Sequence, residues 1–240
     1  MTQLLYTWDS MIKGFDAVVA RRDDQLHAVT LDQTAFYPGG GGQPCDQGWL
    51  QYGGQPLPVQ QVKKVSGEVW HCLPPEVTLP GKGEVVRGVL DWERRYQLMR
   101  THTAMHVLCG VVWRDYGASV TGGDMDPLEG RMDFEFERFS AELVHTIEAA
   151  VNQEIEAGHE VTVKILPREE AFAIPDLIRT KINLLPEGIK EVRTVEIKGL
   201  DLQADGGTHV LNTREVGRVR VVKHKSKGRI NKRIYVAVEE

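Results

Sequence analysis

Long apolar runs are missing from this sequence: no stretch reaches the ~18 consecutive apolar residues that a membrane-spanning helix requires. Residues 1–16 also lack the basic region and the apolar region of a secretory signal. Cysteine is scarce, with only Cys45, Cys72 and Cys109 in the chain, and such an odd, widely spaced set does not indicate a disulfide framework. We therefore expect a cytoplasmic protein with reduced thiols and no membrane partner.

Extreme composition is absent as well. The 240 residues are 41% hydrophobic and 26% charged, with a formal net charge of −5. These values are typical of a folded globular protein and exclude disorder of the whole chain. The length suits one large domain or two small ones.

The small net charge conceals an uneven distribution. Residues 214–233 contain nine Lys and Arg residues and one acid, a net charge of +8, so the other 220 residues carry −13. Positive charge concentrated in this way creates a local potential that attracts phosphate backbones. A solvated surface hairpin shows the same pattern, so charge alone leaves both interpretations open.

The chain changes character near Asp91. Residues 1–90 contain short runs rich in β-branched residues, separated by Gly and Pro, which predict a small antiparallel β-barrel. Residues 91–240 combine helical and strand patterns. We predict an α+β protein with a barrel domain at 1–90 and, at 91–240, a domain whose helices pack on an antiparallel sheet.

Two helices are expected in the second part. The first follows Asp91, and Gly117 suits the position after its end. The second follows Ser140, with apolar residues four apart and Gly158 at its end. The second helix is expected to bury Leu143, Ile147, Val151 and Ile155.

The first motif that can carry chemistry is His102-Thr-Ala-Met-His106. Four residues are just over one helical turn, so both imidazoles project from one face and can share a zinc ion. No glutamate follows His102, so the motif is not that of the HExxH metalloproteases. An isolated pair of this kind is weak evidence of a metal site.

The second motif is Asp201-Leu-Gln-Ala-Asp205-Gly-Gly-Thr-His209. Its two glycines allow a tight turn, through which Asp205 and His209 can converge on one point. The third motif is the run Gly39 to Gly42, between Pro38 and Pro44. This run is neither a Walker A loop nor a dinucleotide-binding motif, and it indicates a loop shaped for close approach to a ligand.

In this order, the three motifs resemble those of the AlaX family of free-standing alanyl-tRNA editing proteins, which are similar to the editing domain of alanyl-tRNA synthetase. The matching segments run from about residue 33 to the C-terminus and are QTAFYPGGGGQPCDQG, RTHTAMH, GRMDFEF and DLQADGGTHVLNTREVG. The glycine-rich segment within an N-terminal barrel resembles the medium-sized type of the family. The resemblance implies a hydrolase that acts in trans and removes serine, and also glycine, from mischarged tRNA(Ala), with no DNA partner.

The resemblance also implies one zinc ion per chain, bound through HxxxH and a second pair that is usually CxxxH. By position, its ligands here are His102, His106 and His209. The chain departs from the pattern at Asp205, where the family usually has cysteine. Because zinc accepts carboxylate oxygen, Asp205 is either the fourth ligand or a group that orients a water in the fourth position. The zinc ion either activates water or positions the substrate.

The resemblance also implies which residues select the substrate and which bind tRNA. A family threonine associated with serine recognition corresponds to Thr34, and Gln43 together with Gly40, Gly41 and Gly42 is expected to line the substrate pocket. If the chain acts on tRNA, the basic residues of 214–233 are expected to bind the phosphates of the tRNA acceptor stem. The expected contacts are Lys223, Lys225, Lys227, Arg229, Lys232 and Arg233.

Two other functions stay open. A related domain in threonyl-tRNA synthetases allows a deacylase for another mischarged tRNA, one charged with or specific for threonine. The departure at Asp205 allows a non-catalytic tRNA-binding module with a structural metal. The intact His102, His106 and His209 favour a functional metal site over the second alternative.

Overall fold

The structure is a computed structural model that describes residues 2–137, 139–178 and 188–239. Its contacts divide the chain into two compact units, residues 1–97 and 98–240. The first residues of the long helix α1 (Trp92–Tyr116) group with the N-terminal unit. The combination of α-helices with antiparallel sheets confirms the predicted α+β class.

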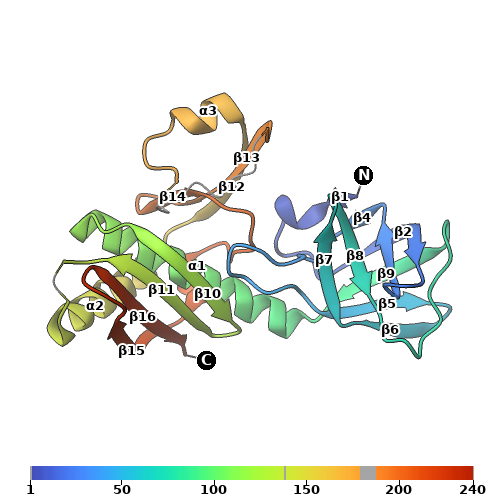
Figure 1. Ribbon diagram of the computed structural model, residues 1–240, viewed down its shortest axis with the longest axis horizontal. Coiled ribbons are helices and arrows are strands. Elements are labelled where there is room, and N and C mark those ends of the chain that lie inside the picture. The colour runs from blue at the N-terminus through green and yellow to red at the C-terminus, as the bar shows by residue number, and fades with distance from the viewer. Residues whose placement is uncertain (1, 138, 179–187, 240) are drawn as a thin grey trace. The chain divides into compact units, whose positions relative to one another are not determined.

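The N-terminal unit is built on a seven-stranded antiparallel sheet with the order β6-β5-β9-β2-β3-β8-β7 (Figure 1). Its strands are β2 (Gly14–Asp23), β3 (Ala28–Leu31), β5 (Gly48–Tyr52), β6 (Gln55–Val59), β7 (Gln61–Val65), β8 (Glu68–Cys72) and β9 (Val85–Leu90). The strands at the two ends of this order, β6 and β7, are joined by Gln60 alone, so the ends of the sheet meet at that residue. This curl agrees with the barrel expected from the strand pattern.

The alternation of β2 explains how the sheet forms its core. Phe15, Ala17 and Val19 are buried, whereas the side chains between them face outward, as the two-residue period of a strand requires. A shift in register between Val19 and Arg21 bends the strand. A short parallel pair, β1 (Gln3–Leu4) and β4 (Gln33–Thr34), and the 3₁₀ turn η1 (Leu5–Thr7) complete the unit.

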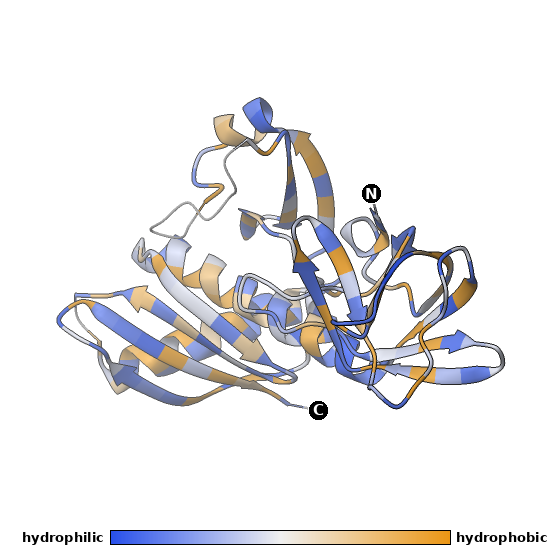
Figure 2. Ribbon diagram, turned by 45° about the vertical axis from the view of Figure 1, so that its right-hand side comes forward, coloured by the Kyte–Doolittle hydropathy of each residue, from blue (hydrophilic) through white to orange (hydrophobic). Residues whose placement is uncertain are grey.

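The C-terminal unit contains two antiparallel sheets, with the orders β10-β11-β16-β15 and β12-β13-β14. After α1, its elements are β10 (Val120–Asp126), β11 (Glu129–Glu135), α2 (Ala141–Ala157), β12 (Val161–Pro167), α3 (Arg168–Ala173), β13 (Glu191–Ile197), β14 (Asp201–Ala204), η2 (Thr213–Val216), β15 (Val219–Ser226) and β16 (Asn231–Val238). Blue and orange alternate along the strands of the four-stranded sheet (Figure 2), so one face of this sheet is apolar.

From Leu98 onward, helix α1 lies inside the C-terminal unit. Every residue from Thr101 to Val112 is buried, and Met105 packs against Gly130 of the four-stranded sheet. Gly117 follows the helix with a φ of 62°, as the sequence predicts. Although α1 is deeply buried, no helix in the described part of the chain is long and apolar enough to cross a membrane.

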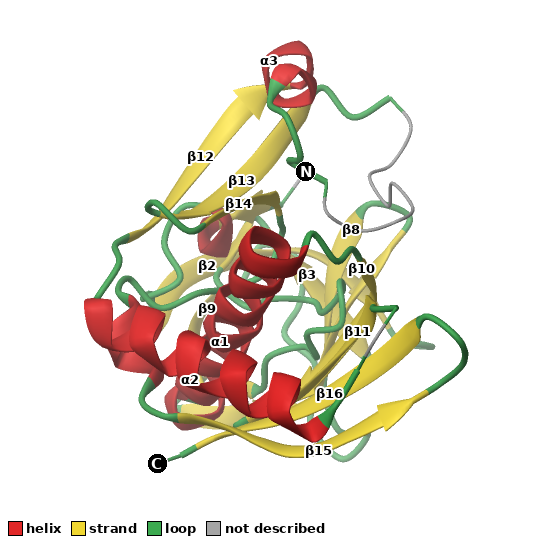
Figure 3. Ribbon diagram, turned by 90° about the vertical axis from the view of Figure 1, so that its left-hand side faces the viewer, coloured by secondary structure: helices red, strands yellow, loops and turns green. Residues whose placement is uncertain are grey.

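Helix α2 begins and ends as its sequence predicts. The Ser140 side chain accepts a hydrogen bond from the Leu143 backbone N–H, and Gly158 ends the helix in the left-handed conformation. One expectation is wrong: Val144, rather than Leu143, is the buried residue of the first turn. The helix packs on β15 (Figure 3), and the orientation of that contact decides which residue faces the sheet.

Candidate metal centre

His102 and His106 lie one turn apart in the buried stretch of α1, as predicted. Their ring centroids are 5.1 Å apart. Buried polar side chains in the middle of a helix require polar partners. The polar partners of these two histidines lie in β14 and in the segment that follows it.

That segment brings two further ligand groups to the same place. The ring of His209 lies 4.2 Å from the ring of His102 and 4.7 Å from that of His106, measured between centroids. The Asp205 carboxylate accepts a hydrogen bond of 2.7 Å from the Gly207 backbone N–H, which closes the turn between Asp205 and His209. One potential ligand atom from each of the four residues lies within 4.8 Å of the others.

The spacing within this cluster suits a divalent metal ion. Asp205 Oδ2 lies 3.0 Å from Nε2 of His209, and Asp205 Oδ1 lies 3.5 Å from Nε2 of His102. Ligands at ~2.0–2.1 Å from a tetrahedral zinc ion are about 3.3–3.4 Å from one another. Three imidazole nitrogens and one carboxylate oxygen therefore form a set that can hold such an ion. Asp205 belongs to the cluster with the three predicted histidines.

Two neighbouring side chains fix the orientation of the imidazoles. Asp201 Oδ2 lies 3.0 Å from Nδ1 of His106, and Thr103 Oγ1 lies 3.2 Å from Nδ1 of His209. The Nδ1 atoms of His106 and His209 are thereby engaged, so Nε2 is the nitrogen of each that can bind a metal. Gln203 in turn donates a hydrogen bond of 2.7 Å to Asp201 Oδ2. Contacts of this kind hold ligand histidines in most metal sites.

The electrostatics of the cluster favour neutral ligands at two positions. Burial lowers the pKa of His102 well below its usual value and lowers that of His209 to about 4. Burial also acts on His106, but the hydrogen bond and charge of Asp201 outweigh it, so the pKa of His106 is raised. Neutral imidazole is the form that coordinates a metal.

The glycine run of the N-terminal unit forms an ordered turn. The backbones of Gly40 and Gln43 exchange two hydrogen bonds of 3.0 Å. Gly41 and Gly42, the two residues between them, have φ angles of 59° and 89°, the positive values that a two-residue type I′ turn requires. The Tyr37 hydroxyl donates a hydrogen bond of 3.0 Å to the Gly40 carbonyl. Gln43 itself is buried.

Thr34 is buried in the same unit. Its Oγ1 lies 2.8 Å from Nε2 of His71 and accepts a hydrogen bond of 3.1 Å from the Phe36 backbone N–H. Nδ1 of His71 lies 3.2 Å from the Val29 carbonyl oxygen. Burial lowers the pKa of His71 to about 4, so this imidazole is neutral.

An unexpected ion pair anchors the end of the glycine-rich segment. The guanidinium of Arg95 is fully buried and contacts both carboxylate oxygens of Asp46. It also donates hydrogen bonds to the carbonyl oxygens of Ser10 and Ala35. Asp46 accepts a further hydrogen bond of 2.6 Å from the Tyr37 backbone N–H. The sequence carries no sign of this pair, because its partners are 49 positions apart.

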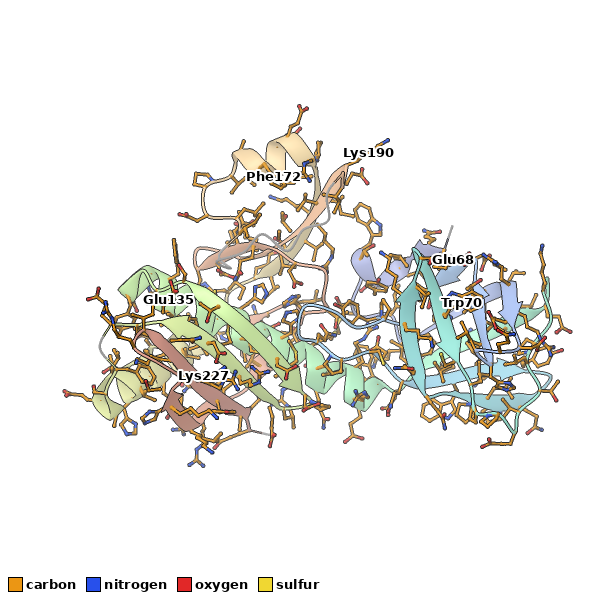
Figure 4. The ribbon with its side chains drawn as sticks, in the orientation of Figure 1. Glu68, Trp70, Glu135, Phe172, Lys190 and Lys227 are labelled. Carbon is orange, nitrogen blue, oxygen red and sulfur yellow. The ribbon has the colours of Figure 1, made fainter. Side chains whose placement is uncertain are left out.

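The six basic residues expected to contact tRNA are not equivalent. Lys232 is buried, and its ammonium group donates three hydrogen bonds within the β15–β16 turn, to Ser226 and to the carbonyls of Gly228 and Arg229. This structural role was not expected from the sequence. Arg233 donates two hydrogen bonds to Asp133, one of 2.5 Å and one of 2.7 Å. Lys227, which is labelled in Figure 4, lies 3.2 Å from the same carboxylate.

The remaining basic residues are exposed. Lys223 and Lys225 lie 5.8 and 5.5 Å from the ring centroid of Tyr235, and Arg229 is exposed in the turn. Hydrogen bonds from Arg233 and Lys225 lower the pKa of Tyr235 to about 8. The hairpin therefore presents a cationic outer surface, although part of its charge is neutralised by Asp133.

From the sequence, three residues around the cluster have no assigned role at the metal site. They are Asp201, Thr103 and Arg193. Asp201 stands four positions before Asp205, and its position in the motif gives no sign that it reaches His106. Thr103 lies on α1 itself, whereas the pairing of β13 with β14 brings Arg193 and Asp201 to the cluster.

Comparison with known proteins gives consistent matches. A family model described as "Threonyl and Alanyl tRNA synthetase second additional domain" matches residues 192–235, which include Asp205 and His209. A second model, "tRNA synthetases class II (A)", matches residues 9–94. An alanyl-tRNA editing protein AlaX-M from Saccharolobus solfataricus is 41% identical over 241 residues, which cover 100% of both chains.

Two further relatives extend this picture. An alanyl-tRNA editing protein AlaX-M from Methanosarcina acetivorans is 38% identical over 98% of each chain. The alanine–tRNA ligase of Pyrobaculum neutrophilum is 38% identical over 229 residues, which cover 92% of this chain and 25% of the ligase. The similarity thus spans both units and includes all four residues of the cluster.

Proposed function

Because the chain belongs to the family of AlaX-M alanyl-tRNA editing proteins, we propose that it deacylates mischarged tRNA(Ala), with serine as the main amino acid removed and glycine as a second. The observation that carries this proposal is the cluster of His102, His106, Asp205 and His209, in a chain that matches its relatives over their full length. An enzyme of this activity belongs in the cytoplasm, where charged tRNA is used.

We propose that the cluster binds one zinc ion per chain. The ligands are Nε2 of His102, His106 and His209, with the Asp205 carboxylate as the fourth, because its oxygens lie 3.0 and 3.5 Å from two of these nitrogens. With four protein ligands no position is left for a water, so a bound zinc ion would supply the positive charge that positions the substrate. The protein's own contribution is to orient the imidazoles of His106 and His209 through Asp201 and Thr103, and to keep His102 and His209 neutral through burial.

Selectivity requires a site that recognises one hydroxyl group. The Val29 carbonyl can only accept, so Nδ1 of His71 carries the proton, and Nε2 accepts the hydroxyl proton of Thr34. Thr34 Oγ1 can then offer a ligand only a lone pair. We propose that this lone pair accepts the hydroxyl of serine, with Gln43 and the turn Gly40–Gly42 lining the pocket. Alanine has no hydroxyl group to donate.

A deacylation panel tests the function. In single-turnover assays, Ser-tRNA(Ala) is expected to be hydrolysed at least ~10³-fold faster than Ala-tRNA(Ala), as a site built to bond a hydroxyl can achieve. Thr34→Val should slow serine removal by about tenfold without slowing glycine removal, whereas Thr34→Ser should restore it.

The same panel separates the alternatives. Equal rates on Ser-tRNA(Ala) and Ala-tRNA(Ala) would contradict the proposed selectivity. Faster hydrolysis of a tRNA charged with threonine would favour the second candidate, a threonine-related deacylase, which the match to a domain of threonyl- and alanyl-tRNA synthetases supports. If no charged tRNA is hydrolysed, the result would favour the non-catalytic tRNA-binding module.

We further propose that the outer surface of the β15–β16 hairpin contacts RNA phosphates through Lys223, Lys225 and Arg229. Replacing Lys223 and Lys225 with alanine is expected to lower the slope of log affinity against log salt by about 1.4–1.8, or 0.7–0.9 for each lost phosphate contact. Lys198→Ala is a control, because Lys198 is also an exposed lysine but lies outside the β15–β16 hairpin. An unchanged slope in the double variant would remove the hairpin from the RNA-binding surface.

A further inference from the structure

Arg193 is a buried cation beside the proposed metal ligands. It lies in the middle of β13, and its side chain is 8% exposed. Its Nη1 donates a hydrogen bond of 2.9 Å to the backbone carbonyl of Asp205 and lies 3.6 Å from Oδ2 of the same residue. The Asp205 backbone N–H donates a hydrogen bond of 3.1 Å to the Arg193 carbonyl. Arg193 therefore contacts Asp205 at three atoms.

These contacts differ from those of the other neighbours of the cluster. Asp201 and Thr103 each orient one imidazole, whereas Arg193 fixes both the main chain and the carboxylate of Asp205. Asp205 begins the turn that also carries His209, so two of the four ligand groups depend on its placement. A buried guanidinium is unfavourable unless it is paired, and the carboxylate beside it is also the group that faces the histidines.

We propose that Arg193 is a positioning residue for the metal site: it holds Asp205 in the orientation in which its carboxylate completes the ligand set. The inference rests on the proposed metal site and requires no assumption about RNA or the amino acid removed. Its hydrogen bond fixes the start of the 205–209 turn. Its charge keeps the carboxylate on the side of the three histidines, where the distances to His209 and His102 are 3.0 and 3.5 Å.

A merely structural Arg193 would stabilise the β13–β14 sheet without affecting metal binding. Three variants separate these roles. Arg193→Lys keeps the charge, Arg193→Gln keeps a hydrogen-bond donor, and Arg193→Met keeps neither. Arg131→Gln is the matched control, because Arg131 also pairs with a carboxylate, that of Asp124 at 3.0 Å, on a different sheet.

The measurement is zinc affinity of the full chain by competition with a chromophoric chelator, together with the absorption spectrum of the cobalt-loaded protein and the thermal midpoint. Arg193→Met and Arg193→Gln are expected to weaken zinc binding by about 10–100-fold, the range for residues that orient ligands. Arg193→Lys should lose less, and Arg131→Gln should match the wild type. Unchanged affinity and an unchanged cobalt spectrum in Arg193→Met would overturn the proposal.

A double-mutant cycle tests the proposal even if the Arg193 variants are less stable than the wild type. If Arg193 acts through the Asp205 carboxylate, Arg193→Gln should weaken zinc binding by less than ~3-fold in an Asp205→Asn background. A loss as large as in the wild-type background would assign Arg193 a structural role. If Arg193→Gln fails to fold, Arg193→Lys in the two backgrounds provides the same comparison. Wild-type protein that binds no zinc would refute the metal site itself, which is a different outcome from intact binding in the Arg193 variants.

Discussion

Replacing His209 with alanine is expected to lower the single-turnover rate on Ser-tRNA(Ala) by at least ~10³-fold and to remove the bound metal. His209 is buried and contributes one of the four groups of the cluster. A metal ion supplies several kcal/mol of transition-state stabilisation, and about 4 kcal/mol corresponds to ~10³ in rate. Metal content and rate are measured on the same preparation.

His145→Ala is the control for this substitution, because His145 is exposed on α2 and should leave both values unchanged. Asp201→Asn should give an intermediate result, with zinc affinity weakened by about 10–100-fold, because His106 loses the carboxylate that orients it. A His209→Ala protein that lacks metal but retains the wild-type rate would show that the cluster is not the catalytic site.

Breaking the pair between Arg95 and Asp46 is expected to destabilise the N-terminal unit by about 3–5 kcal/mol. Asp46→Asn removes one charge and leaves the other buried, since both side chains are almost fully inaccessible. The guanidinium also binds the carbonyls of Ser10 and Ala35, so three segments lose a common anchor. Denaturant unfolding followed by tryptophan fluorescence measures the loss, because four of the five tryptophans lie in residues 1–97.

Glu68→Gln is the matched control for this measurement. Glu68, which is labelled in Figure 4, belongs to the same unit. It pairs with Arg21 at 2.8 Å, and the side chains of Glu68 and Arg21 are 36% and 62% exposed. Exposed pairs contribute ~0–1 kcal/mol. If Asp46→Asn costs no more than Glu68→Gln, the buried pair does not anchor the glycine-rich segment.

Local patterns in the sequence predict much of this fold. The end signals Ser140, Gly158 and Gly117 mark helix boundaries, because capping depends only on neighbouring residues. The spacing of His102 and His106 likewise follows from helix geometry alone. The turn from Asp205 to His209 is equally local, but the candidate ligand set is assigned through the resemblance to a known family, which leaves the role of Asp205 open.

Local sequence patterns do not predict contacts between residues that are far apart in the chain. Asp46 and Arg95 are 49 positions apart, and Asp133 and Arg233 are 100 positions apart. Each pair depends on a strand register or a loop path that no local motif encodes. The same limit applies to charge counts: they detect nine basic residues in 214–233, but only the register of β11 and β16 reveals that Arg233 is engaged by Asp133.

The direct test of the central claim is zinc titration into metal-free protein during hydrolysis of Ser-tRNA(Ala). The rate is expected to rise in proportion to bound zinc and to level off at one ion per chain, with Ala-tRNA(Ala) hydrolysed slowly throughout. Full activity in the metal-free protein, or zinc binding that leaves the rate unchanged, would contradict the assignment of His102, His106, Asp205 and His209 as the metal centre of a deacylase.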